Sequence, residues 1–141
     1  MNQKIAVPRN DLEQLILDVQ SGQLDAEEFA KRILSEQVFL PVKDEKHKIA
    51  GFQSSTKAEP LVIDDEEGNR VMLLFTVPEQ AKAFLRDYPD YSGGLVVEFS
   101  WVLRRTGPEM GIALNPGNDI GFDFDAEMIA MLYSLLPEQA Q

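Results

Sequence analysis

The segment GIALNPGNDIGFDFD, residues 111–125, holds the features that decide the fold of this chain. It sets two short apolar runs on either side of a Pro-Gly turn, together with two further Gly and three Asp. Gly permits positive φ and Pro fixes φ, so this density of both residues specifies a tight backbone path. We expect GIALN to form a strand, PGND a turn and GFDF the returning strand, with Asp125 capping a final helix.

Further apolar runs upstream predict the other strands. They cover residues 38–42, 61–64, 70–76 and 95–99, and a weaker run covers residues 49–52. An acidic turn with Gly68-Asn69 separates the second run from the third, which is typical of a β-hairpin. Residues 70–76 are almost continuously apolar, so we expect this strand to be central and covered on both faces.

Two helix starts near the N-terminus predict a helical hairpin over residues 10–35. Asn10 and Asp25 are each followed three residues later by Glu, which is the spacing of a capping box. Apolar residues recur at helical spacing after each cap, and Gly22 ends the first helix.

Local signals predict two later helices before the last one. Thr76, followed by Glu three residues later, is expected to cap a helix that runs to about Asp87. Ser100 is expected to cap a short helix that carries Trp101 and ends near Thr106. The chain is therefore predicted to be one α+β domain, with a mixed or antiparallel sheet packed by helices and an N-terminal helical hairpin.

Composition excludes several classes of protein. The 141 residues include 24 acids, 13 bases and no Cys, which gives a net charge of −11 and leaves no thiol or disulfide chemistry. Nucleic-acid binding is not expected, because phosphate backbones repel such a chain unless its bases gather on one face. No run approaches 18 apolar residues and the first residues lack a signal-peptide pattern, so we expect a cytoplasmic protein without membrane contact.

Two motifs, in a fixed order, carry a resemblance to a known family. The matching residues are Leu74, Phe75, Thr76, Pro78, Glu79, Ala81 and Phe84, then Gly111, Leu114, Asn115, Pro116, Gly117 and Gly121. Over about residues 38–136 the chain resembles the SseB family, of the enhanced-serine-sensitivity type, and in particular its N-terminal domain. The resemblance implies a helical extension over residues 1–37, an SseB-like domain over residues 38–141 and a loose link to serine tolerance.

Four residues are candidates for binding a ligand or a partner. Asn115 could present its amide to a ligand from the Pro-Gly loop, although a simple turn is the favoured explanation of the loop. Asn118 and Asp119 depart from the small residues that the family pattern has after the Pro-Gly pair. Trp101 is a residue type that anchors interfaces, or else it packs inward from its helix.

Metal and catalytic sites are not expected. Asp119, Asp123, Asp125 and Glu127 are close in sequence, but their spacing is not that of a calcium loop. His47 is the single His, and no nucleophile motif accompanies it. No cofactor motif is present either, so we expect no cofactor and no enzyme activity.

Three functions remain open at this point. The first is a non-catalytic module that binds a protein or a small ligand, with homodimer formation possible. The second is a small acidic chaperone for a secreted protein. The third is a carboxylate-based enzyme, which needs two acids whose pKa values are pushed apart in one pocket.

Overall fold

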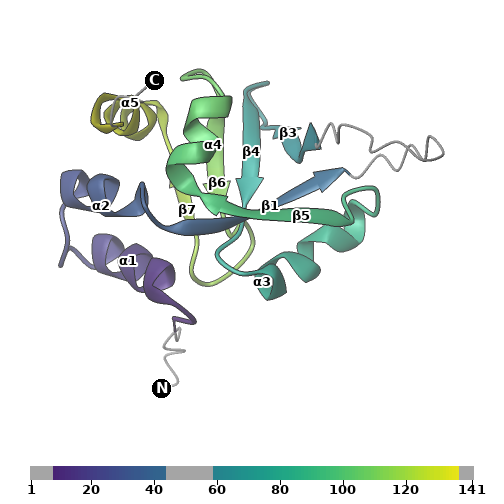
Figure 1. Ribbon diagram of the computed structural model, residues 1–141, viewed down its shortest axis with the longest axis horizontal. Coiled ribbons are helices and arrows are strands. Elements are labelled where there is room, and N and C mark those ends of the chain that lie inside the picture. Colours follow the sequence, from purple (N-terminus) through teal and green to yellow (C-terminus); the bar gives the residue numbers. More distant parts are fainter. Residues whose placement is uncertain (1–7, 44–58, 137–141) are drawn as a thin grey trace, which may run out of the picture.

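Helices surround two small β-sheets in the computed structural model, which describes residues 8–43 and 59–136 (Figure 1). The helices are α1 (Asp11–Gln20), α2 (Ala26–Ile33), α3 (Pro78–Lys82), α4 (Phe99–Arg105) and α5 (Ala126–Leu135), and a 3-10 turn, η1, covers Phe84–Asp87. The strands are β1 (Gln37–Lys43), β2 (Glu59–Pro60), β3 (Val62–Asp64), β4 (Arg70–Leu74), β5 (Gly93–Glu98), β6 (Gly111–Leu114) and β7 (Phe122–Phe124). The predicted α+β class is confirmed. The predicted strand at residues 49–52 and His47 lie outside the described residues.

The strands divide into two sheets rather than one. The first sheet is antiparallel, with the order β2-β1-β5. The second has the order β3-β4-β6-β7, in which β4 and β6 run parallel and the outer pairs run antiparallel. The predicted hairpin around the acidic turn, the central position of β4 and the strand pair β6–β7 are all confirmed.

Backbone hydrogen bonds at Phe75 and at Leu61 join the two sheets. Phe39 of β1 and Phe75, which follows β4, exchange backbone hydrogen bonds of 2.7 and 2.9 Å. Leu61, between β2 and β3, donates to the carbonyl oxygen of Pro41 in β1 at 3.1 Å and accepts from the backbone N–H of Leu73 in β4 at 3.0 Å. Away from these contacts β1 diverges from the second sheet, and the core lies between them.

The helix starts that depend on local capping agree with the prediction. The side chains of Asn10, Asp25 and Asp125 each accept a hydrogen bond from the backbone N–H three residues later. An oxygen at this position satisfies a donor that the first helical turn leaves unpaired. Both helices of the N-terminal hairpin and the last helix therefore begin where the sequence indicates.

Two predicted caps are wrong. Helix α3 begins after Val77 and has no side-chain cap, because the hydroxyl of Thr76 is bonded elsewhere. Helix α4 begins two residues earlier than a cap at Ser100 would allow, with Glu98 at the cap position, so Ser100 lies within the helix. The predicted third helix also breaks in two, as α3 gives way to the 3-10 turn η1.

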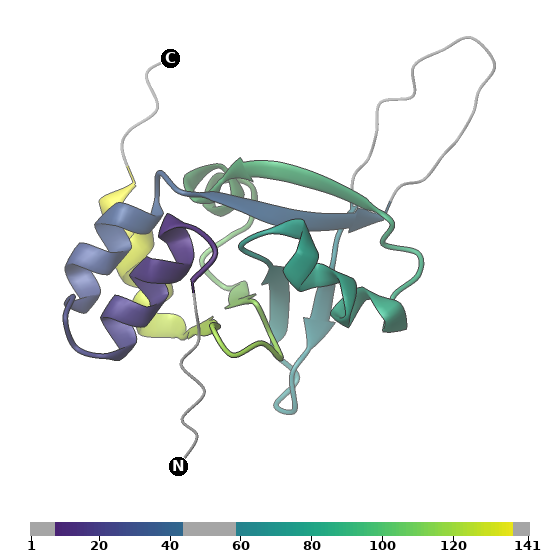
Figure 2. The ribbon, with the colours of Figure 1, turned by 90° about the horizontal axis from the view of Figure 1, so that it is seen from below.

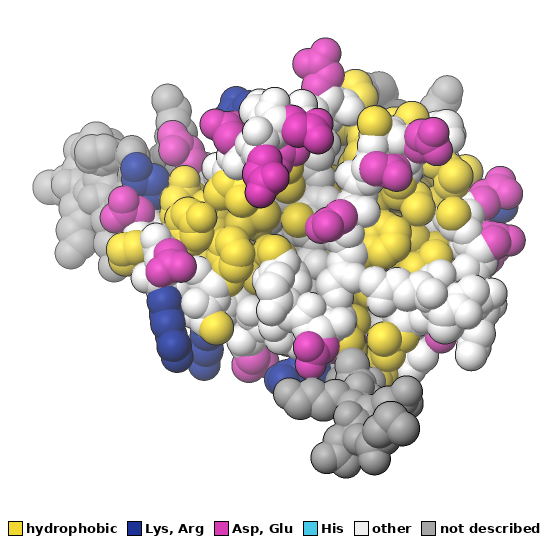
Figure 3. Space-filling model, turned by 180° about the vertical axis from the view of Figure 1, so that it is seen from behind, with side chains coloured by type: hydrophobic (Ala, Val, Ile, Leu, Met, Phe, Trp, Pro, Cys, Tyr) yellow, Lys and Arg dark blue, Asp and Glu magenta, His cyan; other side chains and the backbone are white. Residues whose placement is uncertain are grey.

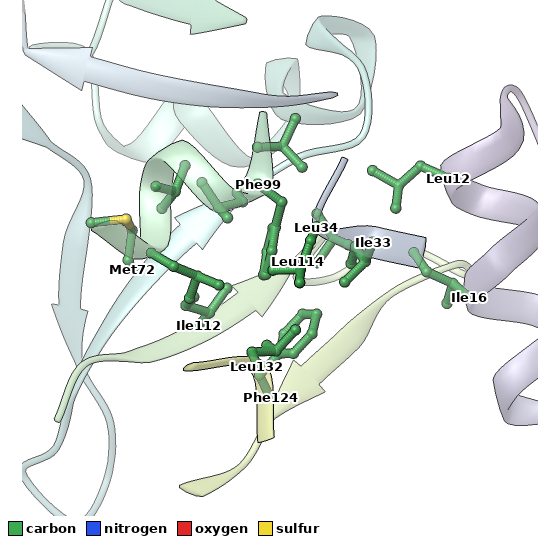
Figure 4. Packing of buried hydrophobic residues seen from close by; sticks show 14 of the residues in the cluster. Leu12, Ile16, Ile33, Leu34, Met72, Phe99, Ile112, Leu114, Phe124 and Leu132 are labelled. Atoms are coloured by element: carbon green, nitrogen blue, oxygen red, sulfur yellow. The ribbon is translucent and has the colours of Figure 1, made fainter. Parts of the chain in front are cut away.

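The N-terminal hairpin shares the core of the sheets. In Figure 2, α1, α2 and α5 lie together at one end of the molecule. Leu12 and Ile16 of α1 point from their helix toward Leu114 and Phe124 of the second sheet in the close view of Figure 4. Phe29 of α2 is fully buried in the same cluster and contacts Phe124 with ring centroids 6.1 Å apart. None of the helices in the described parts of the chain is long and apolar enough to cross a membrane.

Candidate functional site

The carboxyl ends of β4 and β6 meet at one edge of the second sheet, because these two strands are parallel. Open sheets commonly bind ligands at this kind of edge. Asn115 follows β6 directly and has a φ of 54°, and Gly117 in the same loop has a φ of 80°. Gly117 thus uses the positive φ that Gly permits in the predicted turn. Asn is one of the few residues other than Gly that adopts the left-handed conformation readily.

The side chain of Asn115 is wholly enclosed by the protein. Its Oδ1 accepts a 2.9 Å hydrogen bond from the backbone N–H of Thr76. Its Nδ2 donates to Thr76 Oγ1 and to the carbonyl oxygen of Ile120, each at 2.9 Å. The amide therefore holds the loop against the end of β4 and is not presented to a ligand.

Glu13 of α1 completes this buried group, which we call the polar cluster: Glu13, Thr76, Gln80 and Asn115. Glu13 Oε2 accepts a hydrogen bond from the hydroxyl of Thr76 and others from Gln80 Nε2 at 3.2 Å and Asn115 Nδ2 at 3.4 Å. Its Oε1 accepts from the backbone N–H of Arg9 at 2.9 Å. No solvent reaches the Glu13 side chain, so these donors take the place of water.

The polar cluster keeps Glu13 ionised. Burial raises the pKa of a carboxyl group, but hydrogen bonds from Thr76, Arg9, Gln80 and Asn115 outweigh burial and lower the pKa of Glu13 below its ordinary value. The arrangement is therefore suited to a structural anion rather than to an acid that gives up a proton. Sequence reasoning assigned Glu13 only to a capping box, and no local spacing reveals its distant partners.

A polar hollow of about 440 Å³ lies on the outer side of the loop that follows β6. Gln20, Asn118 and Asp119 contribute to its lining, and Gln20 Nε2 donates a 2.6 Å hydrogen bond to the carbonyl oxygen of Gly121. Asn118 is half-buried, with its amide turned toward the carbonyl oxygens of its own loop, and Asp119 is exposed. The structure thus brings Asn118 and Asp119 to one hollow, which Asn115 also borders, although the Asn115 side chain is enclosed.

Trp101 does not belong to this hollow. It is half-buried in α4, where its ring packs against the main core and the guanidinium carbon of Arg105 lies 4.0 Å from the ring centroid. A stacked Arg covers the ring in the manner of a cation–π pair. The four candidate residues from the sequence are therefore not assembled into a single site.

The acidic residues considered for a cation do not converge. Within residues 8–43 and 59–136, no group of three or more His, Cys, Asp or Glu side chains is arranged to hold a metal ion. Asp125 accepts a 2.9 Å hydrogen bond from the backbone N–H of Met128, which is its capping role.

An apolar groove of about 640 Å³ lies on the face of the second sheet formed by Ile63, Val71 and Leu73. We define the groove by the sheet residues that form its floor and by one aromatic residue from η1: Ile63, Val71, Leu73, Ala113 and Phe84. Strand pairing places Ile63 beside Val71, and Leu73 beside Ala113, on this one face. Figure 3 shows exposed hydrophobic areas on the back of the molecule, with acidic side chains beside them.

The groove is covered at one end only. Leu73 and Ala113, near the carboxyl ends of their strands, are buried together with Ala81 of α3. Ile63 and Val71, nearer the amino ends, are only half-buried. The sequence predicted that both faces of β4 would be covered. On the groove side, other elements cover β4 at Leu73 but leave it partly exposed at Val71.

Comparison with known proteins identifies the family. The family model described as SseB protein N-terminal domain matches residues 12–131. The chain belongs to the SseB family. No curated protein and no solved structure matches it.

The SseB match begins at Leu12, so it includes the helical hairpin, whereas the motifs in the sequence indicated a resemblance that starts near Val38. Every residue that forms the polar cluster and the groove lies inside the matched SseB region. The hairpin is thus part of the region described by the family, which agrees with its contribution to the shared core.

Proposed function

We propose that this SseB-family chain is a non-catalytic cytoplasmic binding module whose partner is a protein and whose working surface is the apolar groove. The observation that carries this proposal is the open part of the groove floor, at Ile63 of β3 and Val71 of β4, beside the start of the parallel pair β4–β6. Parallel strands are normally covered on both faces by helices, because their side chains are apolar on both sides. An uncovered part of such a face is a surface on which a partner gains stability by excluding water.

The positions of the shifted carboxyl groups favour binding over catalysis. A carboxylate-based enzyme uses one acid with a raised pKa beside another that stays ionised. Burial, followed by the nearby charge of Asp11, raises the pKa of Glu36, but Glu36 lies in a separate hollow beside α1. Glu13, with its lowered pKa, is enclosed in the polar cluster. Neither residue lines the groove. Asp65 does, but hydrogen bonds from the backbone of Asn69 and Glu67 lower its pKa, so it is not an acid with a raised pKa.

Site-specific photo-cross-linking in cells tests the proposal. Ile63 and Val96 are both β-branched residues on edge strands, but Ile63 faces the groove and Val96, which is 60% exposed, lies on the other sheet. A benzophenone amino acid at position 63 should yield discrete adducts with another protein, and the same group at position 96 should not. Equal adduct patterns from the two positions would contradict the proposal.

The link to serine tolerance that the family implies supplies a cellular readout. A strain that lacks this chain should grow poorly in added serine, and the wild-type chain should restore growth. Val71→Arg places a charge on the groove floor and should restore growth less well than Val96→Arg, if both variants accumulate equally. If both variants restore growth equally, the groove is not needed for serine tolerance, and this result would contradict the proposal.

A further inference from the structure

The border of the groove carries charge of one sign. Four carboxylates line it: Asp65 from the β3–β4 turn, Glu109 from the loop before β6, Asp123 from β7 and Asp125 at the start of α5. All four are exposed. Among the described residues that line the groove there is no Lys, Arg or His.

Within residues 8–43 and 59–136, none of these carboxylates forms a salt bridge with a Lys or Arg, whereas Arg32 and Glu28 on α2 do form one. Asp65 and Asp125 accept backbone hydrogen bonds that fix their positions, and Glu109 and Asp123 extend from loop and strand without such bonds. The net charge of −11 adds a field of the same sign over the whole surface.

The shape of the uncovered face indicates which element is missing. Helices α3 and η1 cover the sheet beside Leu73 and Ala113, and the floor remains open beside Ile63, Val71 and the side-chain-free Gly111. The usual cover for this kind of face is a helix laid across the strands. A helix placed there sets its apolar stripe on the floor and its flanking residues beside the four carboxylates.

We infer that the groove binds a cationic amphipathic helix of a partner protein, with Leu-like side chains on the floor and Lys or Arg beside Glu109 and Asp123. This inference rests on the proposed function and adds the chemistry of the partner. Apolar contact with the floor supplies the stability of the complex, and the carboxylates select for positive charge and accelerate the encounter.

Synthetic peptides of about four helical turns provide the probe. The first carries Leu at positions i, i+3, i+4 and i+7 with Lys elsewhere, the second has the same composition in scrambled order, and the third replaces every Lys by Glu. Fluorescence anisotropy with the full chain should show binding of the first peptide only. Rising salt should weaken this binding, because exposed charge pairs are screened.

Paired variants locate the binding. Glu109→Gln combined with Asp123→Asn removes two charges from the groove border, and Glu27→Gln combined with Asp90→Asn removes two exposed charges elsewhere. The first pair should weaken binding of the Leu-Lys peptide by about threefold to tenfold, and the second by less than about twofold. Val71→Thr keeps the branched shape of the side chain and should weaken binding by about threefold through lost apolar contact.

The outcomes separate this inference from the proposed function. If cross-links form at position 63 but the Leu-Glu or scrambled peptide binds as well as the Leu-Lys peptide, the cationic helix is ruled out and the binding module stands. If both charge pairs weaken binding equally, the peptide is responding to net charge and the inference fails. If sedimentation shows a dimer that the peptide does not dissociate and the groove is blocked in it, the occupant is a second copy and the inference again fails.

Discussion

The hydroxyl of Thr76 donates a hydrogen bond to the carboxylate of Glu13, 63 residues earlier in the chain. This bond fastens the first helix to the end of the central strand β4. Asn115 extends the connection to the end of β6, because its amide bonds to both residues. The sheet edge at which a ligand site is often found is thus closed in this protein by its own side chains.

Replacing Glu13 by Gln is expected to lower the free energy of unfolding by about 2 kcal/mol. The substitution keeps the size of the side chain but removes the charge that strengthens several hydrogen bonds, and it sets an amide donor among existing donors. Urea titration of the wild type and the variant measures the difference. Glu27→Gln, on the exposed side of α2, is the control and should change stability by less than about 0.5 kcal/mol. Equal stability of the two variants would show that the polar cluster adds little.

The stability of the protein should depend on pH through Glu13. Its pKa in the folded state lies below the ordinary value of 4.5, so Glu13 stabilises the fold above that pH. This contribution is lost as the pH falls through the lowered folded pKa. Thermal melts at descending pH should therefore show a shallower loss of stability for Glu13→Gln than for the wild type. Parallel curves for the two proteins would contradict the assignment.

Two substitutions at Asn115 separate its hydrogen bonds from its backbone conformation. Asn115→Gly removes the amide but accepts the φ of 54°, whereas Asn115→Ala removes the amide and is also strained there. Both should destabilise the fold, because Thr76 and Glu13 lose buried partners. The Ala variant should be less stable than the Gly variant by about 1 kcal/mol in chemical unfolding. The reverse order would show that the left-handed conformation is not retained.

A β-branched residue at Gly117 should also be costly. Gly117 has a φ of 80°, and no atom lies within 4 Å of the position that a Cβ would take, so the cost comes from the backbone alone. Gly117→Val should lower stability by about 1–2 kcal/mol. Gly107→Val is the matched control, since Gly107 also has open space but not a positive φ. Calorimetry on both variants checks the difference, and an unchanged melting temperature for Gly117→Val would refute it.

The elements that the sequence predicted well are those set by neighbouring residues. Asn10, Asp25 and Asp125 cap helices because a side-chain oxygen can reach an N–H three residues away, whatever the tertiary structure. Thr76 has the same spacing but does not cap, since a buried carboxylate from another element takes its hydroxyl. Local patterns fail where a distant partner offers a stronger bond.

The candidate site was less accessible to sequence reasoning for the same reason. Asn115 was identified through its turn, yet burial turns its amide inward. The groove has no motif, because its floor residues, such as Val71 and Leu73, look like any core strand. These residues differ from a core strand because α3 and η1 cover only part of their face of the sheet. How much of the face is covered depends on the length and packing of the two helices.

The contact between Glu13 and Asn115 constrains the order in which the chain can fold. The two residues are 102 positions apart, so their bond closes a loop that includes most of the protein. Contacts of this separation form late and slow the overall rate, because chain entropy is lost before they stabilise anything. During synthesis from the N-terminus, α1 emerges early, but Glu13 cannot acquire all of its buried partners until Asn115, which follows β6, has left the ribosome. Until then the group of donors around the ionised Glu13 is incomplete, and the first helix made is among the last to be fully fixed.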